Sequence, residues 1–356
     1  MHKTRIIKKN TYLNEKEFTK ISKILKNHYN LVPTEIEKVR SVYRITTDKG
    51  KYCLKEFKHN DKKAIIGFYL TKHLQENGFN GIAEYYKTKS DLECIKEHGR
   101  YYYLTSWIDG RECNFENFDE LKSSLELLAD FHQKAKGFYL SKVKINSNYN
   151  KWQKKLNLMI EDLKLFKKII LQKRVKTSFD IKYFDMVDYY LNIANKALEK
   201  FKSTAYTKVC DKAREQKFIC HDSFYYQNLL IDKNDKLYLI DLDSIVYDIP
   251  IYDLAKFLRR TLNKSLFYWD FGITEKLIRF YEKNRHIEDE EYEIMLGFLM
   301  IPHRFWKIGR KRYFKHKEWS EEKYNKKLEK EIRLKDKREE FFDKFKNYFV
   351  EKKQDS

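Results

Sequence analysis

One pair of short strands inside an otherwise helical stretch does most to constrain the fold of this chain. From about residue 118 onward apolar residues recur at helical spacing, but LLI at 229–231 and LYLI at 237–240 have the composition of strands and flank a run of turn residues. Folding them into a hairpin brings its two ends together, so we expect Asn228 to lie beside Asp241. Asp243 follows two residues later and shares a face with Asp241 if the second strand continues.

Oxygen atoms gathered in this way are the ligands that suit Mg²⁺, which proteins usually hold with one or two carboxylates while nucleotide phosphates and waters complete the shell. The pattern therefore predicts a metal site made by Asn228, Asp241 and Asp243. The alternative is that Asn228 caps a turn and Asp241 ends a strand. These residues alone do not decide between the two interpretations.

The first part of the chain has the pattern of an antiparallel hairpin. Residues 41–47 (SVYRITT) and 51–57 (KYCLKEF) are rich in β-branched and aromatic residues, and a short turn with a glycine separates them. Side chains alternate along a strand, so Cys53 and Lys55 share one face while Leu54 lies on the other. We expect Lys55 to contact an anion, because a lysine on an inner face of a sheet needs one.

The chain is predicted to form two lobes, because 356 residues are long for a single core. Residues 62–79 predict a helix, and residues 100–113 predict a strand that runs into a polar break at 109–110, which we take as the hinge. The expected fold class is α+β. A small antiparallel, β-rich lobe of about five strands and one helix occupies 1–108, and a larger, mainly helical lobe occupies 109–356.

Each long helix of the second lobe is predicted to bury one apolar stripe. The stripes consist of Leu121, Leu125, Leu128 and Phe131 or His132 in one helix, Trp152, Leu156, Met159 and Leu163 in the next, and Tyr324, Leu328 and Ile332 in the charged segment beyond 318. This last stripe indicates that the charged tail docks on the protein.

The net charge of +21 would attract polyanions such as nucleic acid. Lys, Asn, Ile, Tyr and Phe are abundant while Gly and Pro are few, which is typical of proteins from AT-rich genomes. We therefore attribute the charge to this bias and to solvated faces, and nucleic-acid binding is the less favoured alternative. The basic run at 303–317 is expected to be a packed helix with Phe305 and Trp306 buried and its cations outward, rather than a surface for single strands.

The five cysteines, Cys53, Cys94, Cys113, Cys210 and Cys220, are far apart and include no C-x-x-C pair. They predict neither a zinc site nor a disulfide framework. The start of the sequence is basic but is not followed by an apolar stretch of signal-peptide length, and no segment approaches a membrane span. We expect a soluble chain that is made in the cytoplasm and does not insert into a membrane.

The segment CHDSFYYQN at 220–228 is close to the catalytic loop of a phosphotransferase, in which His, Asp and Asn recur in order. Together with Lys55 in YCLKEF, YLTSW at 103–107 and IDLD at 240–243, it resembles the aminoglycoside and choline phosphotransferase branch of the protein-kinase-like fold. The similarity spans nearly the whole chain.

This resemblance implies ATP and Mg²⁺ as cofactors and assigns residues to them. It places Lys55 on the nucleotide phosphates, Cys53 and Trp107 around the adenine, and Asn228, Asp241 and Asp243 on the metal. In the following segment, YDIPIYDLAKFLRR at 247–260, we expect Asp253 to have a structural role as the cap of a helix N-terminus.

The chain is more closely similar to the CotS family of spore coat proteins, a kinase-like branch from endospore-forming bacteria. Four stretches carry the similarity: ADFHQKAKGF at 129–138, NYNKW at 148–152, the loop at 220–231 with the segment 237–260 that follows it, and PHRFWKIGRKRYF at 302–314. The family implies a coat component that is made in the mother cell and helps the coat to assemble, with other coat proteins as its partners.

Three features depart from an active kinase. Residues 33–44 contain no glycine for a phosphate-covering loop. The helix after the hairpin has no carboxylate to hold Lys55 until Glu76 at its end. Ser223 occupies the position of the catalytic base, five residues before Asn228, and Asp222 is the candidate substitute base, although a neighbouring position generally aims its side chain elsewhere.

We therefore predict a catalytically impaired pseudokinase that acts in coat assembly and binds ATP and Mg²⁺ weakly or not at all. The alternatives are an active ATP-dependent kinase of small molecules or proteins and, less favoured, a nucleic-acid-binding protein.

Overall fold

The computed structural model describes residues 11–58 and 61–354, and these residues form two compact units. Unit 1 holds the described residues up to Asn114, together with 138–145 and 223–245 from later in the chain. Unit 2 holds 115–137, 146–222 and 246–356, as far as they are described. The chain passes from unit 2 to unit 1 between residues 222 and 223, inside the loop that resembles a catalytic loop.

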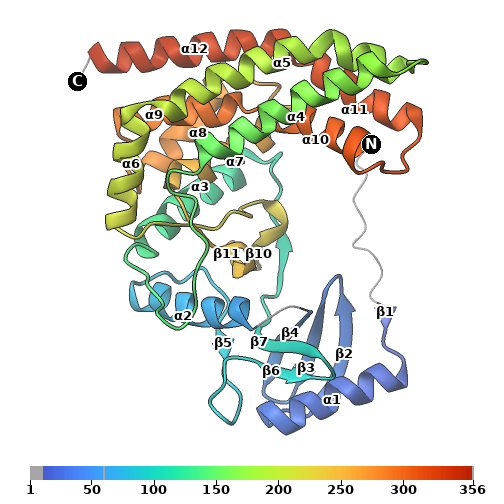
Figure 1. Ribbon diagram of the computed structural model, residues 1–356. Coiled ribbons are helices and arrows are strands. Elements are labelled where there is room, and N and C mark those ends of the chain that lie inside the picture. The colour runs from blue at the N-terminus through green and yellow to red at the C-terminus, as the bar shows by residue number, and fades with distance from the viewer. Residues whose placement is uncertain (1–10, 59–60, 355–356) are drawn as a thin grey trace. The chain divides into compact units, whose positions relative to one another are not determined.

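Unit 1 is built on an antiparallel sheet of seven strands, two more than the sequence suggested (Figure 1). The order is β1-β2-β3-β4-β7-β5, and β6 also pairs with β7. The strands are β1 (Thr11–Tyr12), β2 (Pro33–Val39), β3 (Val42–Thr47), β4 (Gly50–Phe57), β5 (Tyr85–Tyr86), β6 (Ile95–Glu97) and β7 (Arg100–Ser106). The predicted hairpin is β3 with β4, and Leu54 is fully buried on the face opposite to Lys55.

Two helices belong to this part of the chain, where the sequence predicted one. Helix α2 (Lys62–Glu76) is the predicted helix, and α1 (Glu15–Tyr29) was missed. Asn14 caps α1 by accepting a hydrogen bond from the backbone N–H of Glu17 at 2.9 Å. The buried residues of α1 pack on the sheet; the shared core includes Ile21, Leu25, Ile36, Ile45, Leu54 and Leu104.

A second, three-stranded sheet of unit 1 contains the hairpin that the sequence predicted. Strands β10 (Leu229–Asp232) and β11 (Leu237–Leu239) form it, and β8 (Gly110–Glu112) pairs with the other edge of β10. A Cβ on Gly110 would lie 2.6 Å from the carbonyl oxygen of Ile231, so only glycine allows this approach. The segment after the polar break therefore adds a strand to the hairpin.

Unit 2 is mainly helical, as predicted. Its helices are α3 (Phe118–Lys134), α4 (Trp152–Gln172), α5 (Ser178–Lys202), α6 (Thr204–Glu215), α7 (Pro250–Leu262), α8 (Phe271–Glu282), α9 (Asp289–Met300), α10 (His303–Gly309), α11 (Glu321–Arg333) and α12 (Lys335–Gln354), and two short strands, β9 (Ile219–Cys220) and β12 (Val246–Tyr247), pair with each other. Within the described residues, no helix is both long enough and apolar enough to cross a membrane.

The basic run at 303–317 is packed into the core of unit 2. The ring of Phe305 is fully buried and stacks on Tyr183 and Tyr190 at centroid distances of 4.1 and 4.0 Å. Trp306 is only half-buried, and its indole N–H donates to Asp162 at 2.7 Å. The predicted packed helix is thus present, with one of its two aromatic rings fully buried.

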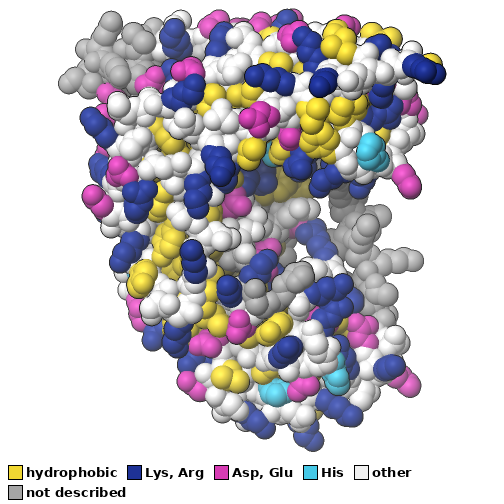
Figure 2. Space-filling model, in the orientation of Figure 1, with side chains coloured by type: hydrophobic (Ala, Val, Ile, Leu, Met, Phe, Trp, Pro, Cys, Tyr) yellow, Lys and Arg dark blue, Asp and Glu magenta, His cyan; other side chains and the backbone are white. Residues whose placement is uncertain are grey.

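Two cations of this run form ion pairs with a neighbouring helix. Arg312 pairs with Glu321 at 2.8 Å and Arg304 with Glu331 at 3.5 Å, so carboxylates of α11 take up part of the charge. Elsewhere Lys and Arg side chains are spread over the face in view and mixed with Asp and Glu (Figure 2). This arrangement agrees with the interpretation of the net charge as solvated faces.

Candidate functional site

Lys55 of β4 lies between the two carboxylates that the sequence assigned to a metal. Its Nζ is 2.7 Å from Oδ1 of Asp241 and 2.9 Å from Oδ2 of Asp243. A second lysine, Lys63 at the start of α2, has its Nζ 3.7 Å from the same oxygen of Asp243. Burial opposes the charged form of Lys55, but the two carboxylates outweigh it and raise its pKa above the usual value. The predicted anion is therefore present, in the form of these two side chains.

The two carboxylates reach Lys55 through a turn, because the strand does not continue as expected. Strand β11 ends at Leu239, and Asp241 has a left-handed backbone with φ of 66°. Residues 242–244 then form a single 3₁₀ turn. Left-handed backbone is uncommon outside glycine but is best tolerated by Asp and Asn. The strained turn thus brings both carboxylates to one lysine.

Two stacked tyrosines cover the other side of Asp243. The hydroxyl of Tyr103 donates to Oδ1 of Asp243 at 3.1 Å, and its ring stacks on Tyr85 at 5.2 Å. Tyr85 in turn lies against Gly67 of α2, where a Cβ would be 2.6 Å from the tyrosine hydroxyl. Gly67 of α2 therefore packs directly on a tyrosine ring of β5, and Lys55 takes its acidic partners from residues 241 and 243.

Asn228 closes the hairpin next to Asp241, as predicted. Its carbonyl oxygen accepts a hydrogen bond from the N–H of Ile240 at 3.0 Å, and its side-chain amide donates to the carbonyl oxygen of Ser223 at 3.0 Å. The carboxylates of Asp241 and Asp243 and the amide oxygen of Asn228 are hard donors of the kind that Mg²⁺ prefers. These residues would hold the ion, and ATP would supply the phosphate oxygens around it. Binding by this set stays a prediction.

Of the residues assigned to the adenine, Cys53 lies on β4 and Trp107 follows the end of β7, both in unit 1. Cys53 is opposite Thr105 of β7, and burial raises the pKa of its thiol to about 11. The backbone N–H of Trp107 donates to the carbonyl oxygen of Lys51 at 3.1 Å, and its indole N–H donates to Asp109 at 3.1 Å. Contacts of Cys53 or Trp107 with a nucleotide stay predictions.

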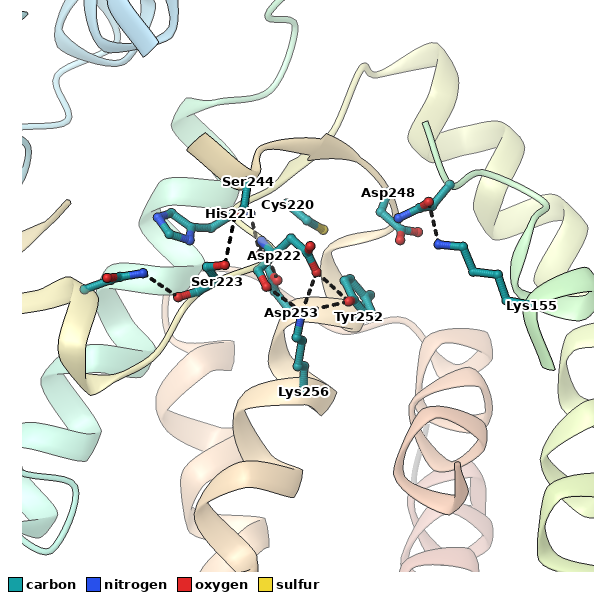
Figure 3. Close-up of polar contacts among 12 residues, drawn as sticks. Lys155, Cys220, His221, Asp222, Ser223, Ser244, Asp248, Tyr252, Asp253 and Lys256 are labelled. Carbon is teal, nitrogen blue, oxygen red and sulfur yellow. Dashed lines mark hydrogen bonds and ion pairs between the residues drawn. The ribbon is translucent and has the colours of Figure 1, made fainter. Parts of the chain in front are cut away.

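In unit 2, Asp253 holds the backbone of the loop at 221–222. Its carboxylate accepts hydrogen bonds from the N–H groups of His221 at 2.6 Å and Asp222 at 3.1 Å (Figure 3). The expectation that Asp253 caps a helix was wrong, because α7 begins after Ile249 and no side chain caps it. Asp253 lies in the first turn of α7, and its carboxylate contacts the loop at 221–222. Its role is structural, as expected, but by a different contact.

Burial and hydrogen bonding act in opposite directions on Asp253. Burial alone would raise the pKa of its carboxyl, but His132, Lys256 and His221 favour the ionised form and bring the pKa below its ordinary value. His132 lies 3.5 Å from Asp253, and burial lowers the pKa of this imidazole. Both shifts favour a neutral imidazole beside an ionised carboxylate.

Asp222, the candidate substitute base, is bound to two side chains of α7. Its Oδ1 accepts a hydrogen bond from the hydroxyl of Tyr252 at 2.5 Å and forms an ion pair with Lys256 (Figure 3). Lys256 also bonds to the carbonyl oxygen of Asp222 and to the hydroxyl of Tyr252. The backbone of Asp222 is left-handed, with φ of 58°. These contacts hold the carboxylate in place and compensate its charge.

Ser223, at the position of the base, belongs to unit 1. Its hydroxyl forms a hydrogen bond with the hydroxyl of Ser244 at 3.0 Å (Figure 3). A hydroxyl group is not a base at neutral pH. A substrate proton would therefore find no acceptor in this pair of serines.

Five residues of these sites were not found from the sequence: Lys63, Tyr103, Ser244, Tyr252 and Lys256. Tyr252 and Lys256 stand four residues apart in YDLAK, which places them on one face of a helix. That spacing was a usable signal for a residue pair that acts together. The other three depend on contacts between distant segments and left no local pattern.

Comparison with known proteins adds a family and a fold. Residues 22–345 match the family described as "Spore coat putative kinase YutH". Spore coat protein S of Bacillus subtilis (strain 168) is 27% identical over 307 residues, which cover 86% of each protein.

Solved structures of phosphotransferases share the fold. An aminoglycoside phosphotransferase from Alicyclobacillus acidocaldarius superimposes with a TM-score of 0.79 at 21% identity, covering 90% of this chain and 93% of that one. A spectinomycin phosphotransferase, solved with ADP and spectinomycin, has a TM-score of 0.56 at 12% identity, with coverages of 87% and 93%. The TM-scores establish the shared fold, and the low sequence identities leave the activity open. Since the matched residues span most of the chain, it belongs to the YutH family of spore coat kinase-like proteins, with the fold of the aminoglycoside phosphotransferases.

Proposed function

We propose that this protein is a spore coat component that keeps the kinase-like fold and acts in coat assembly without transferring phosphate. The observation that carries the proposal is the state of the two candidate bases. Ser223 is bonded to the hydroxyl of Ser244, and the carboxylate of Asp222 is paired with Lys256 and Tyr252. A general base contributes about 10²–10⁴-fold to the rate of such reactions, so its absence alone slows transfer strongly.

The residues assigned to the nucleotide and the metal support weak binding of ATP and Mg²⁺. Lys55, Asp241 and Asp243 supply the charges that such a site needs. However, Lys55 forms ion pairs with the same two carboxylates. A metal ion must then share them with the lysine, and this competition lowers the affinity. Strands β2 and β3 are joined by a two-residue turn without glycine, which offers no extended run of backbone N–H groups to the phosphates.

An active kinase is the second candidate. The observation that favours it is that Lys55 and both carboxylates lie together in one place. Phosphoryl transfer depends more on positioning and charge than on the base, so these three residues could support slow transfer. In that case the substrate would be a small molecule or another coat protein.

Spores made by the organism that carries this chain distinguish the two functions. The gene is deleted and then replaced by the wild-type sequence or by Asp241→Asn, with Ser223→Ala as a matched control, and the coat proteins are extracted and compared. We expect deletion to remove coat proteins and both variants to restore them fully. If Asp241→Asn protein is present at the wild-type level yet the coat stays defective, the protein acts as an enzyme.

A further inference from the structure

Four lysines of unit 2 gather around the indole ring of Trp319, and we call them the Trp319 lysine group. The Nζ atoms of Lys311, Lys317, Lys323 and Lys327 lie 4.4, 5.7, 5.2 and 5.2 Å from the centroid of this ring. No two of them can be further apart than their two centroid distances together, which is about 11 Å. That span is close to the Debye length of about 10 Å at 0.1 M salt, so the four charges act jointly on a ligand.

A buried tyrosine of α11 fixes the backbone that carries the group. The hydroxyl of Tyr324 bridges the carbonyl oxygens of Lys311 and Lys317, at 3.1 and 2.7 Å. Its ring packs on Trp319 at a centroid distance of 5.2 Å. Lys323 and Lys327 stand four residues apart on α11 and therefore share one face of that helix. The group is thus assembled from separate segments around a tyrosine that is almost completely buried.

The carboxylates of α11 pair with other cations. Glu321 pairs with Arg312 at 2.8 Å, and Glu329 with Lys182 at 2.6 Å. Within the described part of the chain, no carboxylate forms an ion pair with a member of the Trp319 lysine group. Residues 304–327 contain ten Lys or Arg and three Glu. This surface therefore carries positive charge that the chain itself does not compensate.

Lys311 is the least exposed member of the group. It is half-buried, whereas the other three lysines are exposed. Burial lowers the pKa of its ammonium group, and neighbouring lysines, Lys317 and Lys327 among them, lower it further. A bound anion would relieve this repulsion.

The position of the ring distinguishes between classes of anionic partner. Proteins that bind single-stranded nucleic acid stack its bases on open aromatic faces. Trp319 is half-buried, and lysine side chains lie over its ring, so a base would have to displace them. Carboxylates need no stacking surface and pair with ammonium groups directly. The arrangement therefore favours an acidic polypeptide over a nucleic acid.

We propose that the Trp319 lysine group binds an acidic segment of another protein, in which several Asp or Glu residues stand close together. An extended chain advances about 3.3 Å per residue, so about four residues span the group. Contact with the ring already restricts the lysine side chains, which reduces the entropy lost when they are immobilised on binding. This inference goes beyond the proposed role in assembly, and it does not depend on whether the chain transfers phosphate.

A labelled hexaglutamate peptide is the probe for this surface. Its fluorescence anisotropy is followed while the purified full-length chain is added at ~0.15 M salt, where long-range attraction is largely screened. Oligothymidylate and inorganic polyphosphate are tested as competitors at equal concentrations of negative charge. The assay requires no spores and no ATP, so its failure would leave the proposed function untouched.

Three variants locate the binding. Lys323→Gln combined with Lys327→Gln removes two exposed members of the group. Lys23→Gln combined with Lys26→Gln removes two exposed lysines of α1 and is the control for the same loss of charge. Trp319→Leu keeps every charge but removes the ring that gathers the ammonium groups, and circular dichroism verifies that it is folded.

We expect the α11 double variant to weaken peptide binding by about tenfold, because each exposed ion pair contributes severalfold. The α1 double variant should bind within about twofold of the wild type, and Trp319→Leu should bind severalfold more weakly. Equal losses in the two double variants, or no saturable binding by the wild type, would overturn the proposal. Oligothymidylate or polyphosphate that displaces the peptide at a lower charge concentration than unlabelled hexaglutamate would also overturn it, and would identify a phosphate-bearing partner instead.

Discussion

The backbone of Asp222 makes a specific prediction about substitutions at this position. Its φ of 58° lies in the left-handed region, where a residue with a Cβ pays a steric cost that glycine avoids. In an ordinary helix Ala is more stable than Gly, but at position 222 the order should be reversed. We therefore expect Asp222→Gly to be more stable than Asp222→Ala by about 1 kcal/mol.

Both variants also lose the side-chain contacts of Asp222, which lowers the stability of each by the same amount. Lys256 and Asp222 have side-chain exposures of 17% and 35%, so their ion pair is only partly screened by solvent. Together with the hydrogen bond from Tyr252, its removal should cost about 1–2 kcal/mol. Asp222→Ala should then lose about 2–3 kcal/mol in total, whereas Asp222→Asn, which tolerates this backbone and keeps hydrogen-bonding atoms, should lose less than either.

Scanning calorimetry of the three variants measures these differences. A matched pair at Lys276, an exposed position inside α8, provides the control: there Gly should be less stable than Ala by about 1 kcal/mol. If Ala is as stable as Gly at position 222, or if Asn is as damaging as Ala, then Asp222 is not held as described and regains its standing as a candidate base.

Three further predictions follow from other contacts. Asp253→Asn should cost about 3 kcal/mol, because the carboxylate accepts two buried backbone N–H groups. The pKa of Asp253 is lowered in the folded state, so its carboxylate stabilises the fold fully above the unfolded pKa of about 3.9, and this stabilisation is lost as the pH falls below that value. The free energy of unfolding of the variant should therefore depend less on pH in that range than that of the wild type. Gly110→Ala should cost about 1–3 kcal/mol, because its Cβ would clash with a carbonyl oxygen of β10, and proteolysis of the β8 segment should become faster; unchanged stability would contradict the close approach. Lys55→Met should increase stabilisation by Mg²⁺ in thermal melts, because the carboxylate of Asp241 loses its competing cation; an unchanged or smaller effect would show that the metal does not use these carboxylates.

Part of this molecule could be predicted from its sequence because the relevant patterns are local. The hairpin at 229–240 follows from strand composition around a turn, and its closure dictates that Asn228 and Asp241 meet. The alternation in β4 likewise places Lys55 opposite the buried Leu54. These patterns depend on residues a few positions apart.

Other features depend on contacts that no local pattern encodes. Helix α1 was missed although Ile21, Ile24 and Leu25 form its buried stripe, because lysines crowd the segment and obscure the periodicity. The expected strand through Asp243 fails because Asp241 adopts a left-handed backbone, which propensity alone does not reveal. The partners of Asp222 come from α7, thirty and more residues away along the chain.

The central claim is that the protein keeps a kinase-like fold but does not transfer phosphate, and an assay with γ-labelled ATP tests it most directly. The purified chain is incubated with Mg²⁺ or Mn²⁺ and with small hydroxylated or amino compounds or extracted coat proteins, and Asp241→Ala serves as the blank. We predict that transfer by the wild type stays at the level of this blank, because neither Ser223 nor the paired Asp222 can accept the substrate proton. Transfer by the wild type that disappears in both Asp222→Asn and Asp241→Ala would contradict the account and identify Asp222 as the base.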